Sequence, residues 1–151
     1  MKGLVVYDSK FGNTEKVAHA IAAALGPEES VRTVKVDAVA AEDLKDLDVI
    51  VVGSPVHAWR PTKEMQAFLD GLQPNALSGV QAAAFDTRYR GRLAGAAADN
   101  IEKALRKQGS TIVAPATGFL VLGSEGPLAE GELDKAVVWA KQILEATGAN
   151  P

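Results

Sequence analysis

The amino-acid sequence predicts an α/β fold in which a single doubly wound, five-stranded parallel sheet carries helices on both faces. Two observations predict it: continuous apolar, β-prone runs recur along the chain, and apolar stripes at helical spacing lie between them. Uninterrupted apolar runs are typical of strands buried on both faces, as in parallel sheets. Their strict alternation with helices predicts a sheet covered on both sides. The 151 residues suffice for one domain, 1–151, with a full core.

The elements follow one another in a fixed order. The runs that predict the five strands are residues 4–7, 31–36, 49–52, 80–85 and 111–121. The stripes that predict the four longer helices are Val17, Ala18, Ile21, Ala22 and Leu25; Met65, Phe68, Leu69 and Leu72; Ala94, Ala97, Ala98, Ile101 and Leu105; and Leu133, Ala136, Val137, Ala140 and Leu144. Gly26 ends the first helix, Pro61 suits the start of the second, and Gly109 closes the third. A short helix is expected at 40–44. Trp139 falls off the last stripe, so we expect it at a core boundary or on a contact surface.

Composition excludes several classes of chemistry. The chain has no cysteine, which excludes disulfides, thiolate metal sites and thiol redox chemistry. Its two histidines are far apart in sequence and give no metal-ligand spacing. The net charge of −3 does not indicate nucleic-acid binding, and the first apolar run is too short for a signal peptide. We therefore expect a cytoplasmic protein whose electron chemistry, if any, needs a bound cofactor.

Ligands of doubly wound sheets bind outside the carboxyl ends of the strands, where the strand order reverses. The loop after the first strand, residues 8–14, runs directly into a helix, whose N-terminus favours an anion. The candidate residues in it are Ser9, Lys10, Phe11, Gly12, Asn13 and Thr14. The loop lacks the glycines of a Walker loop or a GxGxxG fingerprint. Its residues alone leave two interpretations open, a phosphate loop or an ordinary capped turn.

Residues 5–21 resemble the flavodoxin signature at its defining positions. Those positions are Tyr7, Ser9, Gly12, Thr14, Ala18 and Ile21. The resemblance implies FMN as the cofactor, with Ser9, Asn13 and Thr14 holding its phosphate. It also implies the strand order 2-1-3-4-5, for which flavodoxin is itself the standard example, with FMN at the switch point. The chain matches the short form of the family, which lacks an extra loop in the last strand. Lys10 departs from the usual phosphate loop, which relies on hydroxyls and backbone amides.

Two further loops are predicted to hold the flavin ring. The candidates after the third strand are Ser54, Pro55, Val56, His57, Ala58 and Trp59. The candidates after the fourth strand are Asp86, Thr87, Arg88 and Tyr89. Trp59 lies in an irregular loop between two prolines, where stacking on an isoalloxazine is favoured over plain packing. Tyr89 is expected as a second aromatic, with the three residues before it at the ring edge, and Arg90 and Arg92 as a solvated turn.

The predicted cofactor end is basic. Loops 8–14, 54–63 and 86–92 together carry a net charge of +4 on a chain of net charge −3. Flavodoxins that act as carriers present acidic rims, so the sign here is reversed. Positive charge near the flavin favours its anionic reduced form and an anionic partner. We therefore expect a less negative reduction potential than in a typical flavodoxin, and a contact with an acidic protein, NAD(P)H or a carboxylated substrate.

Two functions remain open at this point. The first is an FMN-binding redox protein that transfers electrons between protein partners. The alternative is an FMN enzyme of the same fold, an NAD(P)H or quinone oxidoreductase or a relative of protoporphyrinogen oxidase, and the basic rim favours it. No glycine lies between Ser54 and Thr62, so the peptide flip that stabilises one-electron-reduced flavin in carriers is not specified. A phosphoacceptor receiver domain is rejected because Gly53 and Ser54 stand where its aspartate would be. A cofactor-free binding module is disfavoured by the intact phosphate loop.

Overall fold

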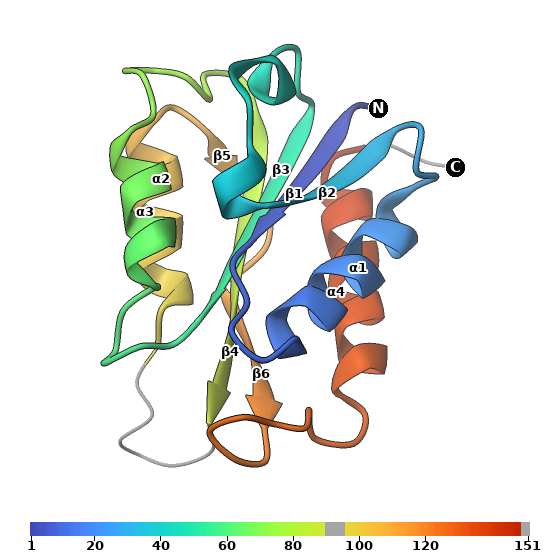
Figure 1. The fold of residues 1–151 in the computed structure, drawn as a ribbon. Helices are drawn as coiled ribbons and strands as arrows, with labels where there is room; N and C mark the ends of the chain where they lie inside the picture. The colour runs from blue at the N-terminus through green and yellow to red at the C-terminus, as the bar shows by residue number, and fades with distance from the viewer. Residues whose placement is uncertain (90–95, 149–151) are drawn as a thin grey trace.

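The structure is a parallel sheet between two layers of helices (Figure 1). The computed structural model describes residues 1–89 and 96–148. Its strands are β1 (Gly3–Tyr7), β2 (Val31–Lys35), β3 (Val49–Pro55), β4 (Gln81–Tyr89), β5 (Thr111–Ile112) and β6 (Thr117–Val121). They pair in the order β2-β1-β3-β4-β5, and β6 also pairs with β4. Every pairing is parallel, so the predicted order 2-1-3-4-5 is confirmed.

The last predicted strand is divided into two pieces. β5 and β6 both pair with β4. The Val113 N–H still donates to the Ala82 carbonyl of β4 over 3.0 Å, and the break lies in the residues that follow, before β6 begins at Thr117. Pro115 lies in this break and has no N–H to donate to a neighbouring strand. The break is short, as expected for the short form of the family.

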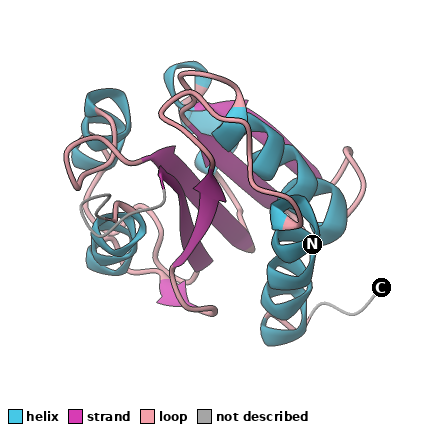
Figure 2. Ribbon diagram, turned by 90° about the horizontal axis from the view of Figure 1, so that it is seen from below, coloured by secondary structure: helices cyan, strands magenta, loops and turns pink. Residues whose placement is uncertain are grey.

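Helices cover both faces of the sheet (Figure 2). Their bounds are α1 (Asn13–Leu25), α2 (Lys63–Asp70), α3 (Ala98–Lys107) and α4 (Glu132–Ala146). The 3₁₀ helices are η1 (Val36–Ala38) and η2 (Ala41–Leu44), the second of which matches the short helix expected there. One core packs the sheet against α1 and α4, and the other packs it against α2 and α3. Because strand side chains alternate between faces, Phe85 joins the first core while Ala84 joins the second.

The apolar face predicted for α4 is wrong, because the face that is buried is rotated about the helix axis from the predicted one. Trp139 lies in the core, edge-to-face with Phe85 and Phe119 at centroid separations of 6.1 and 6.0 Å. Leu133, which was expected to face the core, is exposed. Burial of the indole removes more apolar surface from water than burial of Leu133 would. This difference accounts for the face of α4 that packs on the sheet.

Two strands extend further than predicted at their carboxyl ends. β3 continues to Pro55 and β4 to Tyr89, and the two are paired as far as Pro55 and Thr87. The stretch 86–89 was expected to be a loop and is the end of a strand. Its successive side chains therefore point to opposite faces of the sheet. Arg90 and Arg92, expected as a solvated turn, lie outside the described residues.

Candidate cofactor site

A cavity of about 330 Å³ opens at the carboxyl ends of β1, β3 and β4. It is lined by Ser9, Lys10, Phe11, Asn13, Thr14, Pro55, Val56, His57, Thr87, Tyr89, Val121 and Ser124. Its size falls within the range of small-molecule sites. Two larger hollows of about 520 Å³ lie away from the strand ends, one beside α1 and β2 and one beside α2. Because ligands of such sheets bind at the carboxyl ends, the smaller cavity is the candidate site.

The loop before α1 is shaped for an anion. Gly12 takes the left-handed conformation at φ +89°, and its N–H donates to Ser9 Oγ over 3.0 Å. No side chain caps the helix, which begins at Asn13. The N–H groups of its first turn therefore have no intrahelical acceptor, and the positive dipole end faces the same way. This is the arrangement that binds phosphate at helix N-termini.

Two of the three side chains predicted to hold the phosphate, those of Asn13 and Thr14, already have protein partners outside the loop. Thr14 is buried, and its hydroxyl lies 2.7 Å from the hydroxyl of Thr87 on β4. Asn13 Nδ2 donates to the carbonyl of Glu125 over 3.2 Å. The N–H groups of Ser9 and Gly12 also have acceptors, Asp8 and the Ser9 hydroxyl. The N–H groups in the first turn of α1 are thus the groups most available to an anion.

Asp8 links the phosphate loop to the loop that precedes α2. Its buried carboxylate accepts the Ser9 N–H over 2.9 Å and the hydroxyl of Thr62. Thr62 caps α2 by accepting from Met65 N over 3.2 Å, and its own N–H donates to Ser54 Oγ over 3.0 Å. Sequence reasoning gave Asp8 no role. A charged residue directly after a fully buried strand was the signal for it.

The structure does not bring Trp59 to the cavity. Trp59 lies at the tip of a tight turn in which His57 and Arg60 exchange backbone hydrogen bonds of 2.7 and 3.0 Å. The turn places Ala58 and Trp59 at positive φ, 49° and 64°, and leaves the indole 54% exposed. Non-glycine residues rarely adopt such angles. Val56 and His57 line the cavity from this loop.

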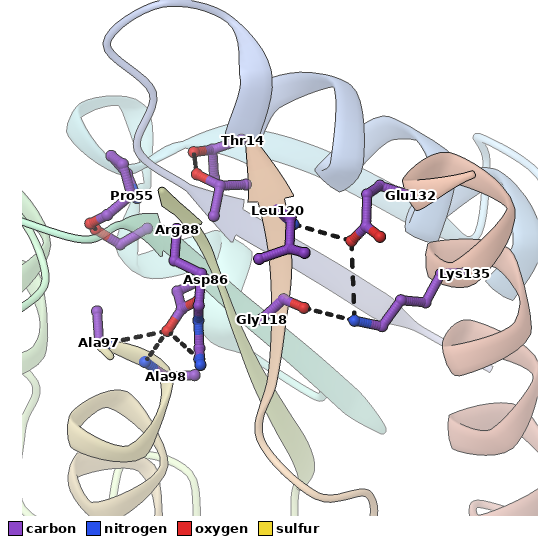
Figure 3. Close-up of polar contacts among 12 residues, drawn as sticks. Thr14, Pro55, Asp86, Arg88, Ala97, Ala98, Gly118, Leu120, Glu132 and Lys135 are labelled. Carbon is purple, nitrogen blue, oxygen red and sulfur yellow. Dashed lines mark hydrogen bonds and ion pairs between the residues drawn. The ribbon is translucent and has the colours of Figure 1, made fainter. Parts of the chain in front are cut away.

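The candidate ring-binding residues at the end of β4 lie on two opposite faces of the sheet. Thr87 and Tyr89 line the cavity, whereas Asp86 is fully buried on the other face. The Asp86 carboxylate accepts from the backbone N–H groups of Ala97 and Ala98 over 2.8 and 2.9 Å (Figure 3). It also pairs with Arg88 through two bonds of 2.7 and 2.8 Å, which raise the pKa of that guanidinium. The side chains of Asp86 and Arg88 therefore bond to each other, that of Asp86 also bonds to the start of α3, and neither lines the cavity. Ring-edge contacts by their backbones stay a prediction.

Comparison with known proteins decides the family. The flavodoxin domain family matches residues 4–118, most of the chain. The chain belongs to the flavodoxin family. It is 33% identical over 89 residues to a flavodoxin of Clostridium saccharobutylicum, a stretch that covers 58% of this chain and 56% of that relative. The chain thus aligns with little more than half the length of this curated flavodoxin.

Solved flavodoxin structures match over almost the full chain. A flavodoxin from the domain Archaea has 26% identity and a TM-score of 0.83, with 98% of this chain and 99% of that one covered. Flavodoxin 2 from Bacillus cereus has 26% identity and a TM-score of 0.82, with 96% and 99% covered. These similarities bear out the flavodoxin-like fold.

The cavity fits FMN, the cofactor of flavodoxins. The N-terminus of α1 suits the phosphate, and the half-exposed ring of Tyr89 offers an aromatic surface on the cavity wall for the flavin. The sequence predicted all the cavity residues that come from the loop after β1 and the start of α1, which are Ser9, Lys10, Phe11, Asn13 and Thr14. It missed Val121 and Ser124, because they lie about a hundred residues further along the chain in a segment without a motif.

The basic character predicted for this end is reduced by ion pairs. Lys10 Nζ lies 3.4 Å from Glu64 Oε1. The pKa of Glu64 lies below its usual value because its carboxylate accepts its own backbone N–H and a hydrogen bond from Lys10. Arg88 is held by Asp86. Within the described part of these loops, Arg60 and Lys63 are the basic side chains without an ion-pair partner.

Proposed function

We propose that this protein is an electron carrier that binds one FMN non-covalently and passes electrons between redox proteins. FMN would supply the electron chemistry. The observation that carries the proposal is one cavity that joins the uncapped N-terminus of α1 to the ends of β3 and β4. The first-turn N–H groups of α1 bind the phosphate, and Asp8 holds that loop in place by bonding Ser9 and Thr62. Thr87 and Tyr89 form the wall nearest the ring.

A visible absorption spectrum tests the cofactor assignment. The purified protein is incubated with FMN and separated from the excess. Retained, structured flavin bands with quenched fluorescence are expected. A colourless protein after incubation with excess FMN would overturn the proposal.

The support for the enzyme alternative is weaker than the charge count of the loops indicates. It rested on a basic rim, and two of the basic side chains in it, Lys10 and Arg88, are paired with acids. Exposed Arg60 and Lys63 remain beside the cavity loops and favour a redox partner that is acidic at the contact. Rapid oxidation of NADPH or of a quinol by the FMN-loaded protein would favour the enzyme. Faster electron exchange with an acidic redox protein, weakened by salt, would favour the carrier.

One broader proposal and one observation accompany this function. We propose that residues 1–151 form one FMN-binding domain, because a single sheet includes every strand of the described chain. Within residues 1–89 and 96–148, no helix combines the length and apolar character needed to cross a membrane.

Trp59 is proposed to cover the flavin when FMN is bound. In the structure its indole is exposed, so the 57–60 turn must change conformation, and positive φ at Ala58 and Trp59 favours such a change. Trp59→Ala is expected to weaken FMN binding by roughly ten-fold, the effect of one lost aromatic contact, and to restore part of the FMN fluorescence. Affinity and fluorescence that match the unaltered protein would show that the ring is covered by Tyr89 alone.

A further inference from the structure

The segment between β6 and α4 forms a hydrogen-bonded hairpin. Val121 and Leu128 pair as an antiparallel bridge, and Leu122 N donates to Pro127 O over 2.8 Å. A tight turn closes the hairpin, with Gly126 N donating to Gly123 O over 3.1 Å. The hairpin leaves β6 at the carboxyl end of the sheet (Figure 1). Its turn is therefore held to the carboxyl end of the sheet by backbone hydrogen bonds.

The turn of this hairpin rests against the phosphate loop. Asn13, the first residue of α1, donates through Nδ2 to the Glu125 carbonyl over 3.2 Å. Gly126 faces the same amide: a Cβ on this residue would lie 2.6 Å from Asn13 Nδ2 and 2.8 Å from Asn13 Oδ1. Absence of a side chain at 126 thus lets the turn approach the start of α1.

Ser124 adds a hydroxyl to the cavity. It is exposed, and it lines the cavity together with Ser9 and Thr14. The hydroxyl of Ser9 accepts the Gly12 N–H and keeps its own proton for donation, whereas that of Thr14 bonds Thr87. Within the part of the chain that the structure describes, the Ser124 hydroxyl has no hydrogen-bond partner, so its proton is free for a ligand.

We propose that the turn Gly123–Gly126 is an additional wall of the FMN site, where Ser124 donates a hydrogen bond to the phosphate and Glu125 orients the Asn13 amide. The inference rests on the proposed function. It follows from the position of Ser124 in the cavity that contains the uncapped start of α1. Hydrogen bonds to a charged acceptor are about twice as strong as neutral ones, so a single hydroxyl has a measurable effect.

Ser124→Ala, titrated with FMN and with riboflavin, tests this contact. We expect the dissociation constant for FMN to rise about ten-fold or more, as for loss of one hydrogen bond to a charged group, and that for riboflavin to stay the same. Equal affinity for FMN in the variant and the unaltered protein, or equal weakening of both ligands, would overturn the inference. An unaltered protein that binds neither flavin would overturn the proposed function as well.

Gly126→Ala and Gly131→Ala form a matched pair. Both glycines have positive φ, 106° and 85°, so both variants strain the backbone. A Cβ at 126 collides with Asn13, whereas a Cβ at 131 meets nothing within 4 Å. We expect Gly126→Ala to weaken FMN binding several-fold more than Gly131→Ala, when both are compared at equal folded fraction. Equal affinities in the two variants would show that the hairpin does not position Asn13 for the phosphate.

Discussion

Replacing Asp86 with alanine is expected to lower the free energy of unfolding by about 3–5 kcal/mol, because it removes a fully buried carboxylate whose donors are two buried N–H groups and a guanidinium that is 30% exposed. The carboxylate is fully buried on β4 and pairs with Arg88. It also accepts the N–H groups of Ala97 and Ala98 at the start of α3, where no side chain of the helix itself provides a cap. Alanine would leave a guanidinium and two N–H groups unpaired. Urea denaturation followed by circular dichroism measures the loss.

Two further variants separate the parts of this interaction. Asp86→Asn keeps an oxygen for Ala97 and Ala98 but loses the charge that holds Arg88, so we expect a smaller loss than for alanine. Asp99→Ala removes an exposed acid from the first turn of the same helix, and a loss of about 0.3–1 kcal/mol is expected from the helix dipole, with a smaller part from the attraction of Asp99 to Arg88. A loss for Asp86→Ala no larger than that for Asp99→Ala would contradict the assigned role.

The position of Asp86 could not be predicted from the sequence. The apolar run that predicts β4 ends at Phe85, so the polar residues after it were interpreted as a loop that contacts the ring. The strand continues instead to Tyr89, because its backbone pairs with both β3 and β6. Alternation then sends Thr87 toward the cavity and Asp86 toward α3. Pairing at the end of a strand depends on its neighbours, and one sequence does not reveal it.

The parts of the site that could be predicted share a local origin. The loop from Ser9 to Thr14 is contiguous and lies between a buried strand and a helix, so its geometry follows from the sequence around it. Ser124 reaches the same cavity from a distant hairpin, and its place depends on how β6 docks on β4. The orientation of Trp59 depends on a turn at positive φ that its residues do not favour. The positions of Ser124 and Trp59 thus depend on features of the folded chain that the residues around them do not reveal.

The sequence of helix α4 allows two apolar faces, and the face that contains the indole of Trp139 is the buried one. Ala136, Trp139, Ala140 and Ile143 are buried, whereas Leu133 and Val138 are exposed. The two buried alanines sit on the face that packs against α1, so their small side chains let the helices approach while the indole fills the space over Phe85 and Phe119. A stripe that only counts apolar residues gives alanine and leucine equal weight and misses this complementarity in size.

Trp139→Ala is therefore expected to lower the free energy of unfolding by about 3–5 kcal/mol, as for other buried aromatic truncations. The variant loses both ring contacts and the hydrogen bond from the indole N–H to the Pro115 carbonyl, 3.1 Å long, which anchors the break between β5 and β6. Trp139→Phe keeps an aromatic ring and is expected to lose less. Val138→Ala, at a neighbouring position that is 57% exposed, is expected to change stability by less than about 0.5 kcal/mol. Thermal and urea unfolding of the three variants measure the differences. If Trp139→Ala were no less stable than Val138→Ala, the indole would contribute nothing to the core, and the face predicted from hydrophobicity alone would have to be reconsidered.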